Sequence, residues 1–381
     1  MAKKLLVSLK NRLAGFLGEK EFLYVTAGNY AMAVLGAVFW IAITWLLTET
    51  DYGLANYLLS IGRIAAVFST LGLDVTVMTF YPKERDAELL RQACLMTLLL
   101  SVTASILCVM LRLPLVAPFI ISLVAFSMTA AVQLGRRMYQ RYFHLCLSLG
   151  VLRLVLGILL CFFYGVAGVI VGYTLASILV GYEYMRLIRP TLRLGKVGEK
   201  INFSLHGLGM RATTALMNFA DKIIIPHAFG MEILSLYTIA YQFFMMFSML
   251  SIGLFQYLLP EKSSGARGRR VELLGMALAT GAMFLGIAVS PYVIENFFPG
   301  WTAGSIIAIQ ISIVGTIPAA IANIRSAKYF SEERPVRVSV AYLASFVFQI
   351  VSILALGSVF GLTGLAVALV LTRAVMVVLI R

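Results

Sequence analysis

Apolar stretches of about twenty residues recur along this chain, and they constrain its fold more than any other feature. A helix needs roughly 20 mainly apolar residues to cross a bilayer, and the sequence offers about twelve such stretches. Only 13% of the residues are charged, against about 25% in a typical soluble protein. The connections are too short to fold as soluble domains. The sequence therefore predicts an all-α integral membrane protein.

The predicted spans alternate with connections of two kinds. We place the spans at residues 22–47, 53–75, 88–111, 114–134, 144–164, 166–187, 203–229, 233–259, 272–293, 303–324, 336–357 and 361–380. Lys and Arg gather in the leading segment and in every second connection, whereas the others are nearly bare, with Arg112 their only basic residue. Because basic residues stay on the cytoplasmic side, we expect a multi-pass protein of the cell membrane with both termini cytoplasmic. The net charge of +14 then reflects orientation and attraction to membrane lipids, and no nucleic acid is expected.

The first twenty residues, "MAKKLLVSLKNRLAGFLGEK", are amphipathic, with leucines on one helical face and lysines largely opposite. They lack the small-residue cleavage site of a secretory signal. We expect residues 1–20 to form a helix on the cytoplasmic face of the membrane, with a partner-binding helix as the alternative. The four cysteines have no metal-ligand or redox spacing, so we expect them to pack as small apolar residues.

The chain divides into two similar halves at its longest basic connection, near residues 186–200. In each half a short acidic turn, a long helix and a Pro-marked basic loop follow one another, ending at Pro82 and Pro260. We expect two pseudo-symmetric six-helix lobes around a central cavity, as in transporters built on parallel repeats. The predicted lobes are residues 21–190 and 203–381, joined by a cytoplasmic linker, 191–202.

The paired stretches "DYGLANYLLSI…LGLD" and "ADKIIIPHAFGMEILSLYTIAYQF…LLPE" resemble the polysaccharide and O-antigen flippases. These belong to the multidrug/oligosaccharidyl-lipid/polysaccharide exporter superfamily. The likeness extends loosely over the whole chain and is sharpest at residues 47–82 and 220–261. It implies two lobes that move a lipid-linked oligosaccharide from the cytoplasmic to the outer leaflet by alternating access. Glycan polymerases or transferases would be the partners of such a flippase.

Basic residues inside the predicted spans indicate an anionic cargo. A charge within a membrane costs several kcal/mol, so it usually pairs or faces something that needs it. Arginine binds phosphate oxygens in a fork and stays charged, which suits the diphosphate of a polyprenyl-linked sugar. The candidate substrate-binding residues are Arg63, Arg211, Arg373, Lys222 and Arg153.

Some of these charges have a structural alternative. Arg153 could pair with Glu183, and Arg63 with Asp74, for packing alone. A straight helix would hold Asp74 three turns from Arg63, which favours substrate binding by Arg63. Arg211 and Lys222 are eleven residues apart and would share one face of a continuous helix.

The carboxylates within the spans are candidates for coupling transport to an ion gradient. Asp221, Asp74 and Glu183 could take a proton or Na⁺. On a continuous helix Asp221 points away from its neighbour Lys222, so we expect no ion pair between them. The chain has no phosphate-binding loop for ATP, and we expect no cofactor or metal.

Three other functions fit part of the pattern. A cation-coupled multidrug or metabolite exporter of the same superfamily would favour acidic residues in the cavity, whereas the deep charges here are mostly basic. A membrane polymerase or ligase of lipid-linked glycans needs catalytic residues in a large outer loop, and the longest, "ENFFPGWTAG", offers only Glu295. A membrane scaffold is the last alternative. We therefore expect a transporter and not an enzyme.

Overall fold

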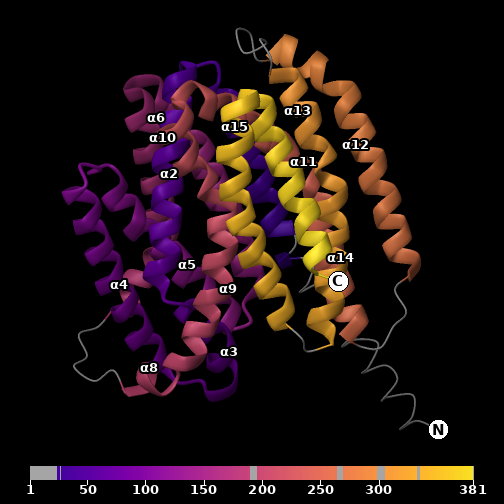
Figure 1. Ribbon diagram of the computed structural model, residues 1–381. Helices are drawn as coiled ribbons and strands as arrows, with labels where there is room; N and C mark the ends of the chain where they lie inside the picture. Colours follow the sequence, from indigo (N-terminus) through magenta and orange to yellow (C-terminus); the bar gives the residue numbers. More distant parts are fainter. Residues whose placement is uncertain are drawn as a thin grey trace. The chain divides into compact units, whose positions relative to one another are not determined.

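The computed structural model describes residues 24–25, 27–188, 195–263, 269–297, 305–332 and 335–380. The amphipathic helix expected at residues 1–20 lies outside this part of the chain. Helices account for the regular structure of the described residues (Figure 1). In chain order they are Ala27–Ile43, α2 (Glu49–Thr70), α3 (Leu73–Glu84), α4 (Ala87–Met110), α5 (Val116–Gly135), α6 (Tyr139–Val180), α7 (Tyr182–Leu187), α8 (Gly195–Glu199), α9 (Ile201–Phe219), α10 (Asp221–Phe229), α11 (Met231–Ser263), α12 (Arg269–Phe297), α13 (Ser305–Val314), α14 (Thr316–Ser331) and α15 (Pro335–Leu379).

The two longest helices are hairpins that turn at a glycine. Gly165 in α6 has φ 56° and ψ −132°, and Gly361 in α15 has φ 56° and ψ −133°, a conformation open to glycine but not to residues with a Cβ. The arms then touch through their backbones: a Cβ on Gly168 would lie 1.9 Å from the carbonyl oxygen of Leu160. In Figure 1 the two arms of α15, in yellow, lie side by side. Each hairpin therefore supplies two of the predicted spans.

The described helices match the twelve predicted spans. Six are long and apolar enough to cross a membrane, and the bent pair α2–α3 makes a seventh. Two of the six are the hairpins. The remaining spans are Ala27–Ile43, α9 with α10, and α11. The protein is an all-α, multi-pass membrane protein, as the sequence predicts.

Two predicted spans are broken where the sequence suggested straight helices. α2 and α3 meet at an angle of 45°, because Leu71 and Gly72 both have positive φ. A Cβ on Gly72 would lie 2.2 Å from the carbonyl oxygen of Ser204, so only glycine permits this approach of α9. The second break separates α9 from α10 at Ala220.

Contacts between Cα atoms group the chain into two compact units, and both are discontinuous in sequence. The first unit comprises Met1–Ile43 and Ala65–Gly209, and the second comprises Thr44–Ile64 and Met210–Arg381. Residues 44–64 join the second unit because α2 begins against α11: a Cβ on Gly53 would lie 2.4 Å from the carbonyl oxygen of Met231. The lobe boundaries 21–190, 191–202 and 203–381 stay a prediction.

The second unit is built around an apolar cluster of α10, α11 and α15. Its buried members are Ile225, Leu234, Tyr237, Tyr241, Phe244, Ile353, Leu365, Ala368 and Leu369. The tyrosines and Phe244 lie on one face of α11 because they recur at helical spacing. This face supports the charged residues described next.

Candidate functional site

A buried ion pair lies at the break between α9 and α10. The ammonium of Lys222 is 3.1 Å from Oδ1 of Asp221, and the two side chains are only 5% and 0% exposed. The expectation that these neighbours would not pair is therefore wrong. It assumed a continuous helix, whereas α9 ends at Phe219 and α10 begins at Asp221.

The two side chains also satisfy the backbone at the break. The Lys222 amide donates to Oδ1 of Asp221 over 2.8 Å, and its ammonium donates to the Asn218 carbonyl over 2.8 Å. An interrupted helix leaves such backbone groups without their usual partners, and in an apolar interior each unmade bond is costly. The pair therefore stabilises the break that brings it together.

Tyrosines of α11 complete the hydrogen bonding. The Tyr237 hydroxyl donates to Oδ2 of Asp221 over 2.7 Å, and the Tyr241 hydroxyl donates to the side-chain oxygen of Asn218 over 3.3 Å. Asp221 thus accepts from a backbone amide, an ammonium and a phenol. This arrangement holds its carboxylate in one orientation.

Aromatic rings lie beneath each cation of the site. The Lys222 ammonium lies 3.6 Å from the centroid of Tyr241. The guanidinium of Arg63 lies 5.2 Å from the ring of Phe219, and that of Arg373 lies 5.5 Å from the ring of Phe244. Each such contact is worth about 0.5–2 kcal/mol, more where water is excluded. The rings therefore stabilise all three cations.

Arg63, Lys222 and Arg373 form one electrostatic group, which we call the cationic cluster. Both arginines act repulsively on the Lys222 ammonium, so all three charges lie near one another. The buried Nε atom of Arg373 has no hydrogen-bond partner among the described residues. Asp221 brings a carboxylate to the cluster through its ion pair with Lys222.

The other candidates lie outside these contacts. Arg211 is partly buried in α9, eight residues before the end of that helix. The helix break between them removes the basis for placing Arg211 and Lys222 on one face. Asp74 is buried in the first unit, where Ser127 donates to its Oδ2 over 3.5 Å.

Glu183 pairs with a different arginine from the one suggested by the sequence. Its Oε1 accepts from Arg136 over 2.6 Å, and Gln133 donates to its other oxygen. Arg153 instead donates to the Ser177 hydroxyl over 3.1 Å and lies 4.9 Å from the ring of Tyr173. The expected Arg153–Glu183 pair is therefore wrong. The Ser177 hydroxyl and the Tyr173 ring lie on the second arm of α6, which the Gly165 turn brings back beside the first.

Sequence patterns do not identify Tyr237, Phe244 and Phe219 as part of the site. Tyr237, Tyr241 and Phe244 follow one another at intervals of four and three residues, which is the spacing of one helical face. That pattern predicts a packed face but not the cations above it. Phe219 gives no signal of its own.

The comparisons with known proteins agree with this fold. The family model of the polysaccharide biosynthesis proteins matches residues 19–265. None of the curated proteins compared by sequence matches this chain.

Three solved structures are similar to this one. The lipid II flippase MurJ in an inward closed conformation is 13% identical, with a TM-score of 0.72 over 94% of this chain and 86% of that chain. An inward-facing multidrug-resistance MATE transporter of the MOP superfamily is 14% identical, with a TM-score of 0.68 over 91% and 92%. A MOP superfamily transporter from Pyrococcus furiosus, described as having a binding pocket of reverse polarity, is 12% identical, with a TM-score of 0.54 over 93% and 92%. These proteins are transporters or flippases, and this chain shares their fold. Since the family model matches well over half of its length, the chain belongs to the polysaccharide biosynthesis protein family.

Proposed function

We propose that this protein is a flippase that carries a polyprenyl-diphosphate-linked oligosaccharide from the cytoplasmic to the outer leaflet of the cell membrane by alternating access. Arg63, Arg373 and Lys222, with Arg211 and Arg153 as further candidates, bind the diphosphate. Both chain termini lie in the cytoplasm.

The observation that carries the proposal is the gathering of three cations, Arg63, Lys222 and Arg373, in one membrane-embedded region. A charge there is costly, so it usually pairs with a group of opposite charge or serves a ligand. A diphosphate supplies the opposite charge, and a guanidinium can bind two of its oxygens at once. Arg373, with its unpartnered Nε, is the first residue we expect to bind the diphosphate.

Similar proteins support the class of cargo. The family takes its name from polysaccharide biosynthesis, and one structure of the same fold is a lipid II flippase. The MATE likeness keeps a multidrug or metabolite exporter as the alternative. That function predicts an acidic binding region, and the carboxylate of Asp221 is already engaged by Lys222 and Tyr237.

Coupling to a proton or Na⁺ gradient is part of the proposal. Asp221, Asp74 and Glu183 are the candidate carboxylates, and Asp221 is the strongest because it contacts the cationic cluster directly. Cargo binding that draws Lys222 away from Asp221 would free the carboxylate for a cation. Glycan polymerases or transferases are the proposed partners on either side of the flipping step.

A translocation assay in proteoliposomes tests the function. A fluorescent polyprenyl-diphosphate oligosaccharide is incorporated with the protein, and the fraction quenched from outside is followed with and without pH or Na⁺ gradients. We expect flipping by the wild-type protein and a loss of at least about tenfold in rate for Arg63→Gln or Arg373→Gln, because each removes a charge-assisted bond to phosphate. Arg337→Gln is the matched control, since Arg337 is exposed and contacts only Tyr329 among the described residues.

Two outcomes would contradict the proposal. Unchanged flipping by both cluster variants would remove the phosphate-binding role. Efflux of a cationic dye without any flipping of the lipid-linked sugar would favour the exporter.

A further inference from the structure

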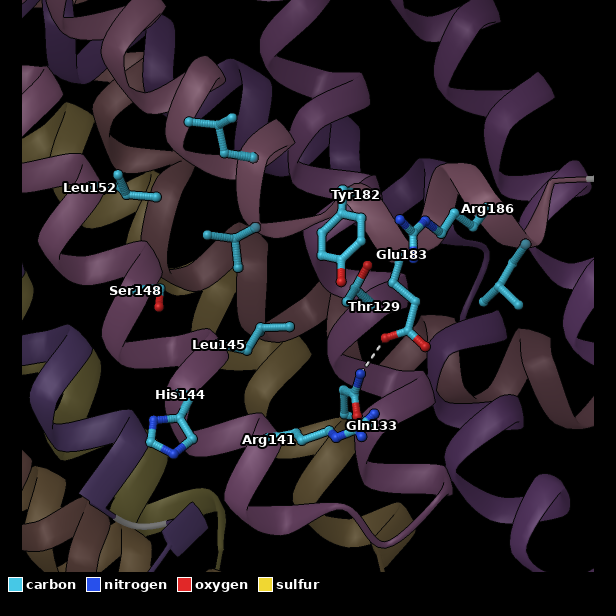
Figure 2. Close-up of a pocket in the computed structure, with 13 residues that line it drawn as sticks. Thr129, Gln133, Arg141, His144, Leu145, Ser148, Leu152, Tyr182, Glu183 and Arg186 are labelled. Atoms are coloured by element: carbon cyan, nitrogen blue, oxygen red, sulfur yellow. Dashed lines mark hydrogen bonds between the residues drawn. The ribbon is translucent and has the colours of Figure 1, made fainter.

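The first unit contains a cavity of about 680 Å³ that the proposed transport mechanism does not use. Figure 2 shows its lining side chains, which come from the end of α5, both arms of α6 and α7. None of them belongs to the cationic cluster. These segments end at basic connections, so the sequence places the cavity on the predicted cytoplasmic side.

The described residues that line the cavity leave a positive charge after the Glu183–Arg136 ion pair is set aside. Glu183 is the only carboxylate among the described residues that line the cavity, and its Oε1 forms an ion pair with Arg136 over 2.6 Å. Arg141 and Arg186 remain as lining cations. Neither forms an ion pair with a residue in the described part of the chain, and Arg186 only lies 4.8 Å from the ring of Tyr182.

One polar atom of the lining also lacks a partner. Gln133 is 5% exposed, and its amide nitrogen is taken by Glu183. Its Oε1 accepts no hydrogen bond from any described residue. A buried amide oxygen without a donor costs about 1–3 kcal/mol, so a ligand hydroxyl that donates to it would remove this cost. His144 and Ser148 offer further polar groups on α6.

Most of the remaining lining is apolar, and this apolar part continues onto the outer surface of the helices. Leu152 and Leu179 line the cavity, and Leu179 is 57% exposed. One turn farther along the first arm of α6, Val155 is 54% exposed. In a membrane-spanning helix such side chains contact acyl chains. The cavity therefore joins a cationic, hydrogen-bonding end to a lipid-facing surface.

We propose that this cavity binds the headgroup of an anionic glycerophospholipid from the predicted cytoplasmic leaflet. Its phosphate lies between Arg141 and Arg186, a headgroup hydroxyl donates to Oε1 of Gln133, and the acyl chains run past Leu152 and Leu179. Basic pockets between helices on the cytoplasmic side are the kind of site that anionic headgroups occupy. A zwitterionic headgroup fits less well, because its ammonium would approach the two guanidinium groups.

The test measures binding of short-chain lipids to the purified full-length protein in neutral detergent. Dioctanoyl phosphatidylglycerol is titrated against dioctanoyl phosphatidylcholine, with bound lipid counted by native mass spectrometry. We expect the anionic lipid to bind at least about tenfold more tightly, because two guanidinium groups bond its phosphate. Arg141→Gln/Arg186→Gln removes this preference, while the matched control Arg91→Gln/Arg337→Gln, which alters two exposed arginines outside the cavity, keeps it.

A second variant tests the space of the cavity independently of its charge. Ser148→Phe fills the space from an exposed position on α6 and leaves both arginines in place, so it should also abolish the preference. Equal binding of the two lipids would overturn the proposal, as would wild-type preference in both cavity variants. If a polyprenyl diphosphate displaced phosphatidylglycerol from this site at lower concentration, the occupant would be the cargo instead. None of these outcomes depends on whether the protein flips lipid-linked sugars.

Discussion

Removing one member of the Asp221–Lys222 pair should destabilise the protein strongly, whereas removing both should not. At 3.1 Å and an effective dielectric constant of about 20, the attraction between the two charges is roughly 5 kcal/mol. Both side chains are almost completely buried, so either charge left alone has no water to replace its partner. Loss of one partner of a buried pair costs about 3–5 kcal/mol. We expect Asp221→Leu and Lys222→Met each to lower the free energy of unfolding by this amount.

The compensated variant carries Asp221→Leu, Lys222→Met and Tyr237→Phe. The third change is needed because the Tyr237 hydroxyl would lose its acceptor on Asp221, which costs about 1–3 kcal/mol for a buried donor. Replacing a buried pair by apolar residues of similar volume is often neutral or stabilising. We therefore expect the free energy of unfolding of the triple variant to lie within about 2 kcal/mol of the wild-type value.

The free energy of unfolding is measured by reversible unfolding in mixed micelles titrated with a denaturing detergent. The wild-type protein, each single variant, the double variant and the triple variant are compared. Single variants that cost under about 1 kcal/mol would show that the pair is solvated or absent. A triple variant that lost the sum of the single losses would show that the two charges do not compensate each other. A stable triple variant that no longer flips the lipid-linked sugar would show that the pair also serves transport.

Three further predictions follow from the described geometry. Gly165→Ala should lower the free energy of unfolding by about 1–3 kcal/mol because its φ of 56° is closed to residues with a Cβ; Gly281→Ala, which meets nothing within 4 Å, is the control, and equal effects would contradict the turn. Tyr241→Leu should cost about 0.5–2 kcal/mol by removing the ring beneath the ammonium, whereas Tyr241→Phe, which keeps the ring, should cost less in the same unfolding assay. Arg136→Gln should cost only about 1 kcal/mol, since its bond to Glu183 is partly exposed, and a thermal melt in detergent should show a correspondingly small shift.

The sequence predicts the spans well because a bilayer imposes one length and one composition on every crossing helix. The glycine at 165 separates two predicted spans in the sequence as it does in the structure. The deep cations Arg63 and Arg373 are also visible in the sequence, since charge is rare in such segments.

The sequence fails where two residues meet through a break in a helix. Asp221 and Lys222 are adjacent, and helical geometry separates adjacent side chains unless the helix is interrupted. No Pro or Gly marks the interruption at Ala220. Likewise, Glu183 accepts a hydrogen bond from Arg136, which lies in a predicted connection between spans. No helical spacing in the sequence relates these two positions. Such pairings depend on tertiary contacts, which a single sequence does not reveal.

The hairpin turns at Gly165 and Gly361 affect how the protein is made. Because the arms touch through their backbones within five residues of the turn, each arm covers part of the other's surface before any other helix arrives. We expect the translocation machinery to release each hairpin into the bilayer as a finished pair. A reporter domain fused at either glycine would force the arms apart, so fusions at these two positions would report on a misassembled product and not on the native orientation.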